Sequence, residues 1–244
     1  MDYDRYEQVQ GWHAESFGQC PPEQASYFVR ELATCRLDLA DVSSALDIGF
    51  GNGNFIGWAR DHKGWSCVGV EVNSRLLDRA RLANFPAWES VAALRSARAD
   101  ARFDLITAFD VLEHIERAHI VPFLQELLAV SGANTRVVLR FPNGDNPFSA
   151  PVQNGDVTHC STIGQNLLRQ VAHLAGFEVE MLRSPVPGSL GSGVAGKFKL
   201  AAGLCARACI GGVLRHVFMG GQPVLFSTNL LAVLRPATPS GAHD

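Results

Sequence analysis

Two acidic residues and three alternating glycines have the types and spacing of a nucleotide-binding turn. They are Asp47, Gly49, Gly51, Gly53 and Glu71. Glycine lets the backbone of a strand-to-helix turn approach a ligand closely, and a carboxylate about 20 residues further on can accept both hydroxyls of a ribose. The sequence therefore predicts a pocket for a ribose-bearing cofactor at this turn.

The glycine spacing differs from the G-x-G-x-x-G fingerprint of dinucleotide-binding turns. That fingerprint needs a third glycine where the following helix packs beneath a pyrophosphate. Counted from Gly49 this position is Asn54, and counted from Gly51 it is Ile56. A cofactor without a pyrophosphate therefore suits the turn better, and a tight turn that binds no ligand is the alternative.

Strand and helix patterns alternate along most of the chain. Apolar runs predict strands and amphipathic patterns predict helices. The strands are 45–48, 66–71, 87–91, 103–109, 136–141, 177–182 and 223–234; the helices are 23–35, 54–62, 74–84, 120–130 and 163–175. Repeated strand-helix units predict an α/β fold with a doubly wound parallel sheet. The 244 residues fit one domain (1–244), with residues 1–40 as an N-terminal helical cap.

Residues 185–223 interrupt this alternation with a glycine- and proline-rich linker and an apolar, basic segment. Residues 1–180 hold 23 acidic and 15 basic side chains, whereas residues 181–244 hold 1 and 6. A membrane span is not expected, because Arg207 at its centre would cost about 2.5–3.5 kcal/mol and no uncharged run reaches roughly 20 residues. Three alternatives stay open: a lid, a homodimer contact, or a peripheral segment on anionic lipid.

The composition also indicates which cellular compartment and which kinds of binding partner to expect. The chain begins with charged residues and no apolar leader, and its six cysteines show no CxxC spacing, which predicts a cytoplasmic protein with reduced thiols. If the basic segment rests on lipid, the protein lies at the inner face of the membrane. The acidic body and the lack of an aromatic-basic stripe argue against a nucleic-acid partner. No metal is expected, since no His, Asp and Glu set has a recognisable ligand spacing.

Two motifs together resemble the class I S-adenosylmethionine-dependent methyltransferases. The turn reads D-x-G-x-G-x-G from Asp47, and the run FDLITAFDVLEHI from Phe103 is similar to the segment after the fourth strand of these enzymes. The resemblance implies a seven-stranded Rossmann-like sheet with an antiparallel last strand, which the helical insertion precedes. It also implies S-adenosylmethionine as cofactor, with Glu71 on the ribose hydroxyls and with Asp47 and Asp110 at the amino-acid end.

The remaining cofactor contacts are less clearly marked. The usual acidic signature after the third strand is missing, and Glu89 or Ser90 is the expected adenine contact. Tyr27 and Phe28 are expected to close over the cofactor from the N-terminal helix, or else to belong to the core.

The segments RFPNGDNPF and QNGDVTH, after the fifth strand, form a long polar loop of the kind that often carries function. Together with Trp12 and Tyr27-Phe28 they resemble methyltransferases of bacterial surface-polysaccharide and glycolipid biosynthesis, over roughly residues 5–183. This resemblance implies O-methylation of a saccharide or glycolipid hydroxyl. A quinone or other lipid acceptor and a non-catalytic, cofactor-binding accessory protein are the alternatives.

Methylation of a hydroxyl benefits from a base that removes its proton. The predicted base is His159, oriented by Asp156 or Asp145, with His114 as the second candidate. Either histidine could instead serve only to hold its loop or helix in place.

Overall fold

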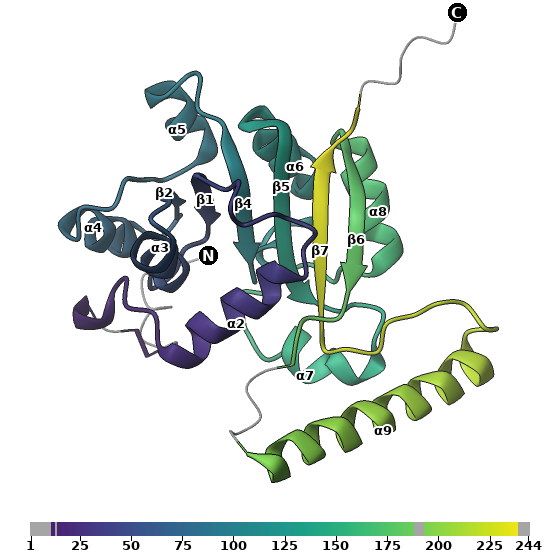
Figure 1. The fold of residues 1–244 in the computed structure, drawn as a ribbon. Helices are drawn as coiled ribbons and strands as arrows, with labels where there is room; N and C mark the ends of the chain where they lie inside the picture. The colour runs from purple at the N-terminus through teal and green to yellow at the C-terminus, as the bar shows by residue number, and fades with distance from the viewer. Residues whose placement is uncertain (1–10, 13, 188–192, 239–244) are drawn as a thin grey trace, which may run out of the picture.

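The computed structural model describes residues 11–12, 14–187 and 193–238. Within them, seven strands form one sheet in the order β3-β2-β1-β4-β5-β7-β6 (Figure 1). Their bounds are β1 Ser44–Ile48, β2 Ser66–Val70, β3 Ala87–Trp88, β4 Phe103–Phe109, β5 Ser131–Pro142, β6 Phe177–Arg183 and β7 Asn229–Pro236. β7 is antiparallel to both of its neighbours, and β1 to β5 are parallel. The predicted α/β Rossmann-like sheet with an antiparallel last strand is confirmed.

Helices cover both faces of this sheet (Figure 1). They are α2 Pro22–Ala33, α3 Asn54–Trp58, α4 Ser74–Leu82, α5 Val91–Ala97, α6 Ile120–Ala129, α7 Ala150–Gln153, α8 Gln165–Leu174 and α9 Val194–Phe218. Successive side chains of a strand point to opposite faces of the sheet, so each strand contributes apolar side chains to two hydrophobic cores, one on each face. In β5, Val137 and Leu139 pack in the core beneath α5, α6 and α8, whereas Val138 packs with α2 and α3.

Two predicted strands are shorter in the structure. β3 stops at Trp88 because the Ser90 hydroxyl accepts a hydrogen bond from the Ala93 amide (3.0 Å) and caps α5, a helix that the sequence analysis does not predict. β7 begins at Asn229 and not at residue 223. The carbonyls of Leu225 and Ser227 accept from the side-chain amide of Asn143 (2.7 and 3.0 Å), so this stretch is a loop held by a side chain.

The insertion contains α9, a helix of 25 residues that lies near the carboxyl ends of the parallel strands (Figure 1). By length and composition, α9 is the one helix among the described residues that could cross a membrane. Residues 1–10 of the predicted cap and residues 188–192 of the predicted insertion lie outside the described residues.

Candidate active site

The glycine turn after β1 has the close-approach geometry that its spacing predicts. Gly49, Gly51 and Gly53 have φ values of 65°, 52° and 72°, in the left-handed region that favours glycine. A Cβ atom on Gly51 would lie 2.8 Å from the ring of Trp12, and one on Gly49 would lie 2.7 Å from Val111. Side chains at these positions would therefore clash with Trp12 and Val111.

Two buried carboxylates flank the turn. Glu71 accepts hydrogen bonds from the backbone amides of Gly51 (3.1 Å) and Asn73 (3.0 Å), and Asp47 accepts one from the Thr107 hydroxyl (2.7 Å). Burial raises the pKa of Asp47 to about 7, although the Thr107 hydrogen bond opposes the shift. Burial also raises the pKa of Glu71, although the hydrogen bonds that it accepts from backbone amides oppose this rise. Both groups would gain from a ligand that brings hydroxyls or a positive charge.

These groups open into a cavity of about 850 Å³. It lies at the carboxyl ends of the parallel strands, where open α/β sheets bind ligands. The predicted site residues that line it are Phe28, Asp47, Gly49, Gly51, Glu71, Asp110, His114, Asp156 and His159. The volume is in the upper part of the usual range for ligand pockets, so it can hold a cofactor and an acceptor together.

Three predicted site residues are not among the residues that line this cavity: Gly53, Glu89 and Asp145. Gly53 precedes α3 and serves the turn. Glu89 is exposed, and the neighbouring Ser90 caps α5. The Asp145 carboxylate accepts the Gln165 amide at the start of α8 (2.7 Å). The expectation that Asp145 orients His159 is therefore wrong, and the structure does not place Glu89 or Ser90 at the cavity, where Val72 lies beside Glu71.

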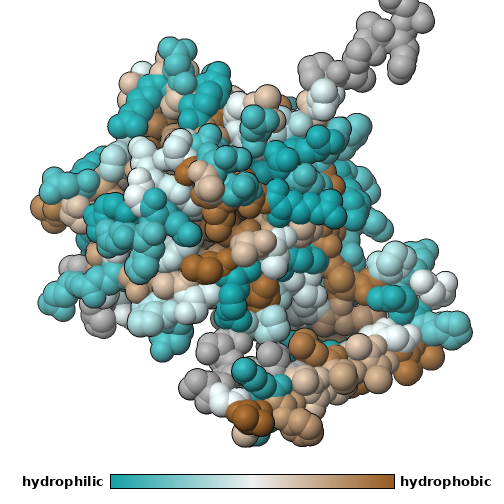
Figure 2. Space-filling model, in the orientation of Figure 1, coloured by the Kyte–Doolittle hydropathy of each residue, from teal (hydrophilic) through white to brown (hydrophobic). Residues whose placement is uncertain are grey.

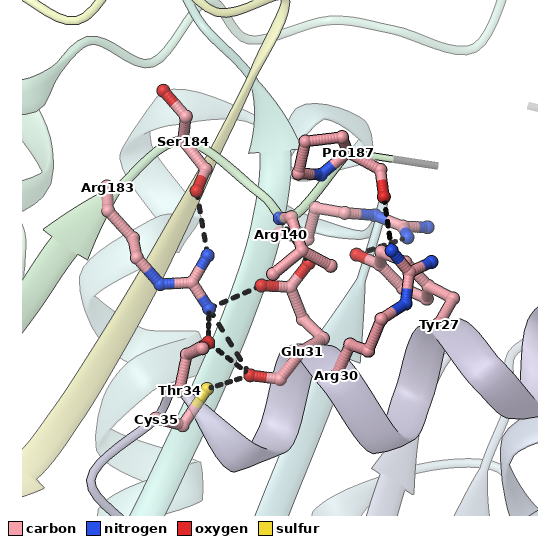
Figure 3. A network of polar contacts seen from close by, with 10 residues as sticks. Tyr27, Arg30, Glu31, Thr34, Cys35, Arg140, Arg183, Ser184 and Pro187 are labelled. Carbon is pink, nitrogen blue, oxygen red and sulfur yellow. Dashed lines mark hydrogen bonds and ion pairs between the residues drawn. The ribbon is translucent and has the colours of Figure 1, made fainter. Parts of the chain in front are cut away.

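Asp110 is paired with an arginine that sequence reasoning does not identify. Arg140, near the end of β5, donates through Nε to Asp110 (3.0 Å) and through Nη1 to the Tyr27 hydroxyl (3.0 Å). Figure 3 shows Arg140 reaching Tyr27 of α2. Asp110 itself has a φ of 57°, an unusual backbone conformation at the end of β4. The ion pair holds α2, β4 and β5 together at the edge of the cavity.

His114 belongs to a hydrogen-bonded relay. The Thr158 hydroxyl donates to Asp156 (2.5 Å) and lies 2.8 Å from His114 Nδ1. A hydroxyl has one proton, so Nδ1 is the donor in the second contact when Asp156 is ionised. Burial and the neighbouring His159 lower the pKa of His114. Asp156 thus orients His114 through Thr158.

His159 is oriented by a backbone group. Its Nδ1 lies 2.9 Å from the Gln153 carbonyl, which can only accept, so Nδ1 carries the proton and Nε2 holds the lone pair of the neutral ring. Nε2 is 3.9 Å from Oε1 of Glu113, and the rings of His159 and His114 meet edge to face at 4.8 Å. The prediction that Asp156 or Asp145 orients His159 is therefore corrected: the Gln153 carbonyl orients it.

Glu113 is the chemically most unusual group in the cavity. Its carboxyl is 2% exposed, and Oε2 has no hydrogen-bond partner among the described residues. Burial, reinforced by Asp110, raises the pKa of Glu113 to about 8, so the group is largely protonated at neutral pH. The LEHI motif places Glu113 at the site, but its protonation depends on packing that the sequence does not display.

Three side chains of this cavity have the ligand atoms of a divalent-metal site. One ligand atom each from Glu113, His114 and His159 lies within 4.8 Å of the others. The expectation of no metal depends on spacing along the sequence, and here the ligand types come together from two distant segments. The geometry is compatible with either proton transfer or cation binding, and these can be distinguished by chelation.

Replacing Glu113 with glutamine should make the protein more stable at pH 8 by roughly 3–5 kcal/mol, and about equally stable at pH 5. Between pH 4.5 and 8 the unfolded state releases the Glu113 proton while the folded state keeps it, so the free energy of unfolding of the wild type falls as pH rises. The glutamine side chain of the variant cannot ionise, which removes this fall. Urea unfolding of both proteins at pH 5 and pH 8 measures the difference, and an equal difference at both pH values would contradict it.

Comparisons with known proteins agree with this architecture. A family model described as "Methyltransferase domain" matches residues 22–182. No curated protein matches the chain. Among solved structures, a SAM-dependent methyltransferase from Archaeoglobus fulgidus has a TM-score of 0.63 at 15% identity, covering 97% of this chain and 100% of that one.

Two further structures are similar in fold. A putative methyltransferase in complex with the Haloferax volcanii Trm112 activator has a TM-score of 0.62 at 13% identity, covering 97% of this chain and 96% of that one. The O-methyltransferase NcsB1 from neocarzinostatin biosynthesis, solved with S-adenosylmethionine and a naphthoic acid, has a TM-score of 0.52 at 12% identity, covering 85% and 52%. The family match and the fold place this chain in the methyltransferase-domain family, as an S-adenosylmethionine-dependent methyltransferase.

Proposed function

We propose that this methyltransferase transfers a methyl group to a hydroxyl of a saccharide or glycolipid, with His159 as general base. The single observation that supports this most is the hydrogen bond of His159, a residue that lines the cavity: the Gln153 carbonyl holds Nδ1–H, so Nε2 keeps the lone pair. A hydroxyl is a poor nucleophile until its proton is removed, and this nitrogen is the acceptor for that proton.

The residues at the other end of the cavity fit S-adenosylmethionine. The glycine turn lines the cavity with backbone that no Cβ atom covers, and the two buried carboxylates have the chemistry for hydroxyls and an ammonium group. Glu71 would hold the ribose hydroxyls and Asp47 the amino-acid end. When bound, the cofactor supplies a methyl group on a sulfonium.

The protein's own part of the reaction is positioning and proton transfer. An acceptor hydroxyl between His159 and the cofactor end would give up its proton to Nε2, which would make its oxygen a nucleophile for the methyl group that the cofactor would supply. The imidazolium so formed would have its Nε2 3.9 Å from Oε1 of Glu113, close enough for the carboxyl group to stabilise the new positive charge until solvent takes the proton. Near-attack positioning can lower the activation barrier by about 7–11 kcal/mol, and a general base can raise the rate by a further ~10²–10⁴-fold.

The acceptor end of the cavity favours a polyhydroxylated substrate. Asp156 and Asn229 line it together with the backbone at Gly155, and such groups can hydrogen-bond several hydroxyls. A quinone or other lipid acceptor is the second candidate, supported by the exposed apolar surface of α9.

The test is turnover with methyl-labelled S-adenosylmethionine on three acceptor pools: water-soluble saccharides, glycolipids and isoprenoid quinones. Label in the first two pools, lost in His159→Gln, supports the proposal. Label in quinones alone favours the second candidate. No label in any pool, with cofactor binding intact, supports the non-catalytic alternative.

Treatment with EDTA should leave turnover unchanged if the cluster of Glu113, His114 and His159 transfers protons without a metal. A neutral Glu113 is a weak cation ligand at pH 7, and metal binding requires the deprotonated form. The measurement is the initial rate before and after chelation, with Mg²⁺ or Zn²⁺ added back. Loss of activity that either ion restores would contradict the expectation and assign the cluster to a metal.

A further inference from the structure

The side of α9 that faces away from the domain carries several exposed apolar side chains. Ile210, Val213 and Val217 follow one another at three- and four-residue spacing and are 56%, 62% and 64% exposed. Phe198, at 74% exposed, extends this surface toward the start of the helix. Figure 2 shows the tan and brown residues along α9 below the body of the molecule. A helix on the surface of a soluble domain normally points its apolar stripe inward, so this surface calls for a partner.

The contacts of α9 with the domain come from the opposite side. Gly211 is buried close to Phe226, and Arg215 Nη2 lies 3.4 Å from the Val224 carbonyl. At about 100° per residue, Ile210, Val213 and Val217 are turned roughly 120–180° away from the mean direction of these two contacts. The apolar stripe is therefore not covered by another described part of the chain.

The charge of α9 indicates what covers it. The helix carries Lys197, Lys199, Arg207, Arg215 and His216 and has no acidic residue. The domain before it is acidic, with 23 acidic against 15 basic side chains in residues 1–180. Exposed apolar side chains and basic side chains on one helix without acidic residues complement an anionic bilayer surface, where the apolar groups enter the headgroup boundary and the cations meet phosphates.

Both ends of the insertion are tied to the same edge of the domain. At its start, Glu31 of α2 accepts the Val186 amide (2.9 Å) and Arg30 donates to the Pro187 carbonyl (2.8 Å; Figure 3). At its end, Asn143 donates to the Ser227 carbonyl (3.0 Å). The strands that flank the insertion, β6 and β7, pair with each other, with Arg183 opposite Leu231.

This arrangement excludes α9 as a single transmembrane span. If α9 crossed the bilayer, the chain after Met219 would have to return through the hydrocarbon to reach β7 beside β6. Residues 219–229 are all described and contain no helix, and backbone without internal hydrogen bonds does not cross lipid. Although the length and composition of α9 would allow it to span a membrane, α9 must instead lie along the membrane surface.

We propose that α9 docks in the plane of an anionic membrane and holds the mouth of the active-site cavity at the lipid interface. The insertion leads directly into Asn229, which lines that cavity. Resting on the proposed function, this identifies the acceptor class as one whose saccharide is attached to a membrane-embedded lipid.

The test is co-sedimentation of the full-length protein with vesicles of phosphatidylcholine alone and of phosphatidylcholine mixed with phosphatidylglycerol. Wild type should bind the anionic vesicles, and binding should fall with added salt. The triple variant I210D/V213D/V217D should bind at least about 10-fold more weakly. The variant K197Q/K199Q/R207Q should lose about 5-fold per charge removed.

The matched control is Leu82→Asp, which adds one charge at a residue 84% exposed on α4. It should leave vesicle binding unchanged, and S-adenosylhomocysteine binding by every variant checks the fold. Absence of wild-type binding to anionic vesicles, or equal binding by the triple variant, would overturn the proposal. So would a wild-type dimer that the triple variant breaks without any vesicle binding. Vesicle binding without methylation of a lipid-linked acceptor would leave the docking standing and refute the lipid-linked acceptor class.

Discussion

Replacing His159 with glutamine should lower kcat about 10²–10⁴-fold while leaving the Kd for S-adenosylhomocysteine unchanged. Glutamine keeps the polar volume and can still donate to the Gln153 carbonyl, but it has no nitrogen that accepts a proton near neutral pH. The ring contacts Gln153, Glu113 and His114, none of which belongs to the glycine turn, so cofactor affinity should not change. Single-turnover kinetics and titration calorimetry measure the two quantities.

The matched control is His114→Gln, because His114 lines the same cavity and meets His159 edge to face. If His159 is the base, the His114 variant should lose less activity, and added imidazole should partly restore His159→Gly but not His114→Gly. The reverse order of losses would transfer the role to His114 and its Thr158–Asp156 relay. Near-normal turnover in both variants would remove general-base catalysis from the mechanism.

Replacing Glu71 with alanine should weaken S-adenosylhomocysteine binding about 10²–10⁴-fold. A ribose diol donates two hydrogen bonds to the carboxylate, and each hydrogen bond to a charged group contributes about 1.5–3 kcal/mol. The alanine variant also frees the amides of Gly51 and Asn73, so some loss comes from a looser turn. Calorimetry on both proteins gives the ratio of Kd values.

Two comparisons separate these contributions. Glu71→Gln keeps one oxygen acceptor for the turn and loses the charge, so it should retain the melting temperature better than affinity. Glu89→Ala removes an exposed acid near the end of the next strand and should change neither. An unchanged Kd in Glu71→Ala, or binding of NADH in place of S-adenosylhomocysteine, would refute the cofactor assignment of the turn.

The sequence predicts the cofactor half of the site better than the acceptor half, for a physical reason. Gly49, Gly51 and Glu71 act through backbone conformation and strand position, and both follow from local pattern. The roles of Glu113 and Arg140 depend instead on what packs around them after the chain folds. Burial raises the pKa of Glu113 to about 8, and Arg140 lies far along the sequence from Asp110, with which it pairs.

Side chains that bind the backbone explain the errors of prediction in the same way. Asp145 has the right residue type for a catalytic partner, but its carboxylate holds the first turn of α8. The apolar run from residue 223 has the composition of a strand, but the side chain of Asn143 binds its carbonyls in place of a neighbouring strand. In both cases the deciding hydrogen bond joins residues 20 or more positions apart, which period and propensity do not report.

The place of β7 in the sheet has a consequence for how the domain assembles. β7 lies between β5 and β6, and within the described residues it is the sole strand that pairs with β6. The sheet therefore stays open at β5 until the chain has passed through the whole insertion, and β6 has no hydrogen-bonded neighbour among the described strands before then. Such late, long-range closure is slow, because the loop entropy is lost before the strand contacts compensate for it. Helix α9 is thus part of a long connection that the final folding step must close, and the strand that follows it completes the sheet.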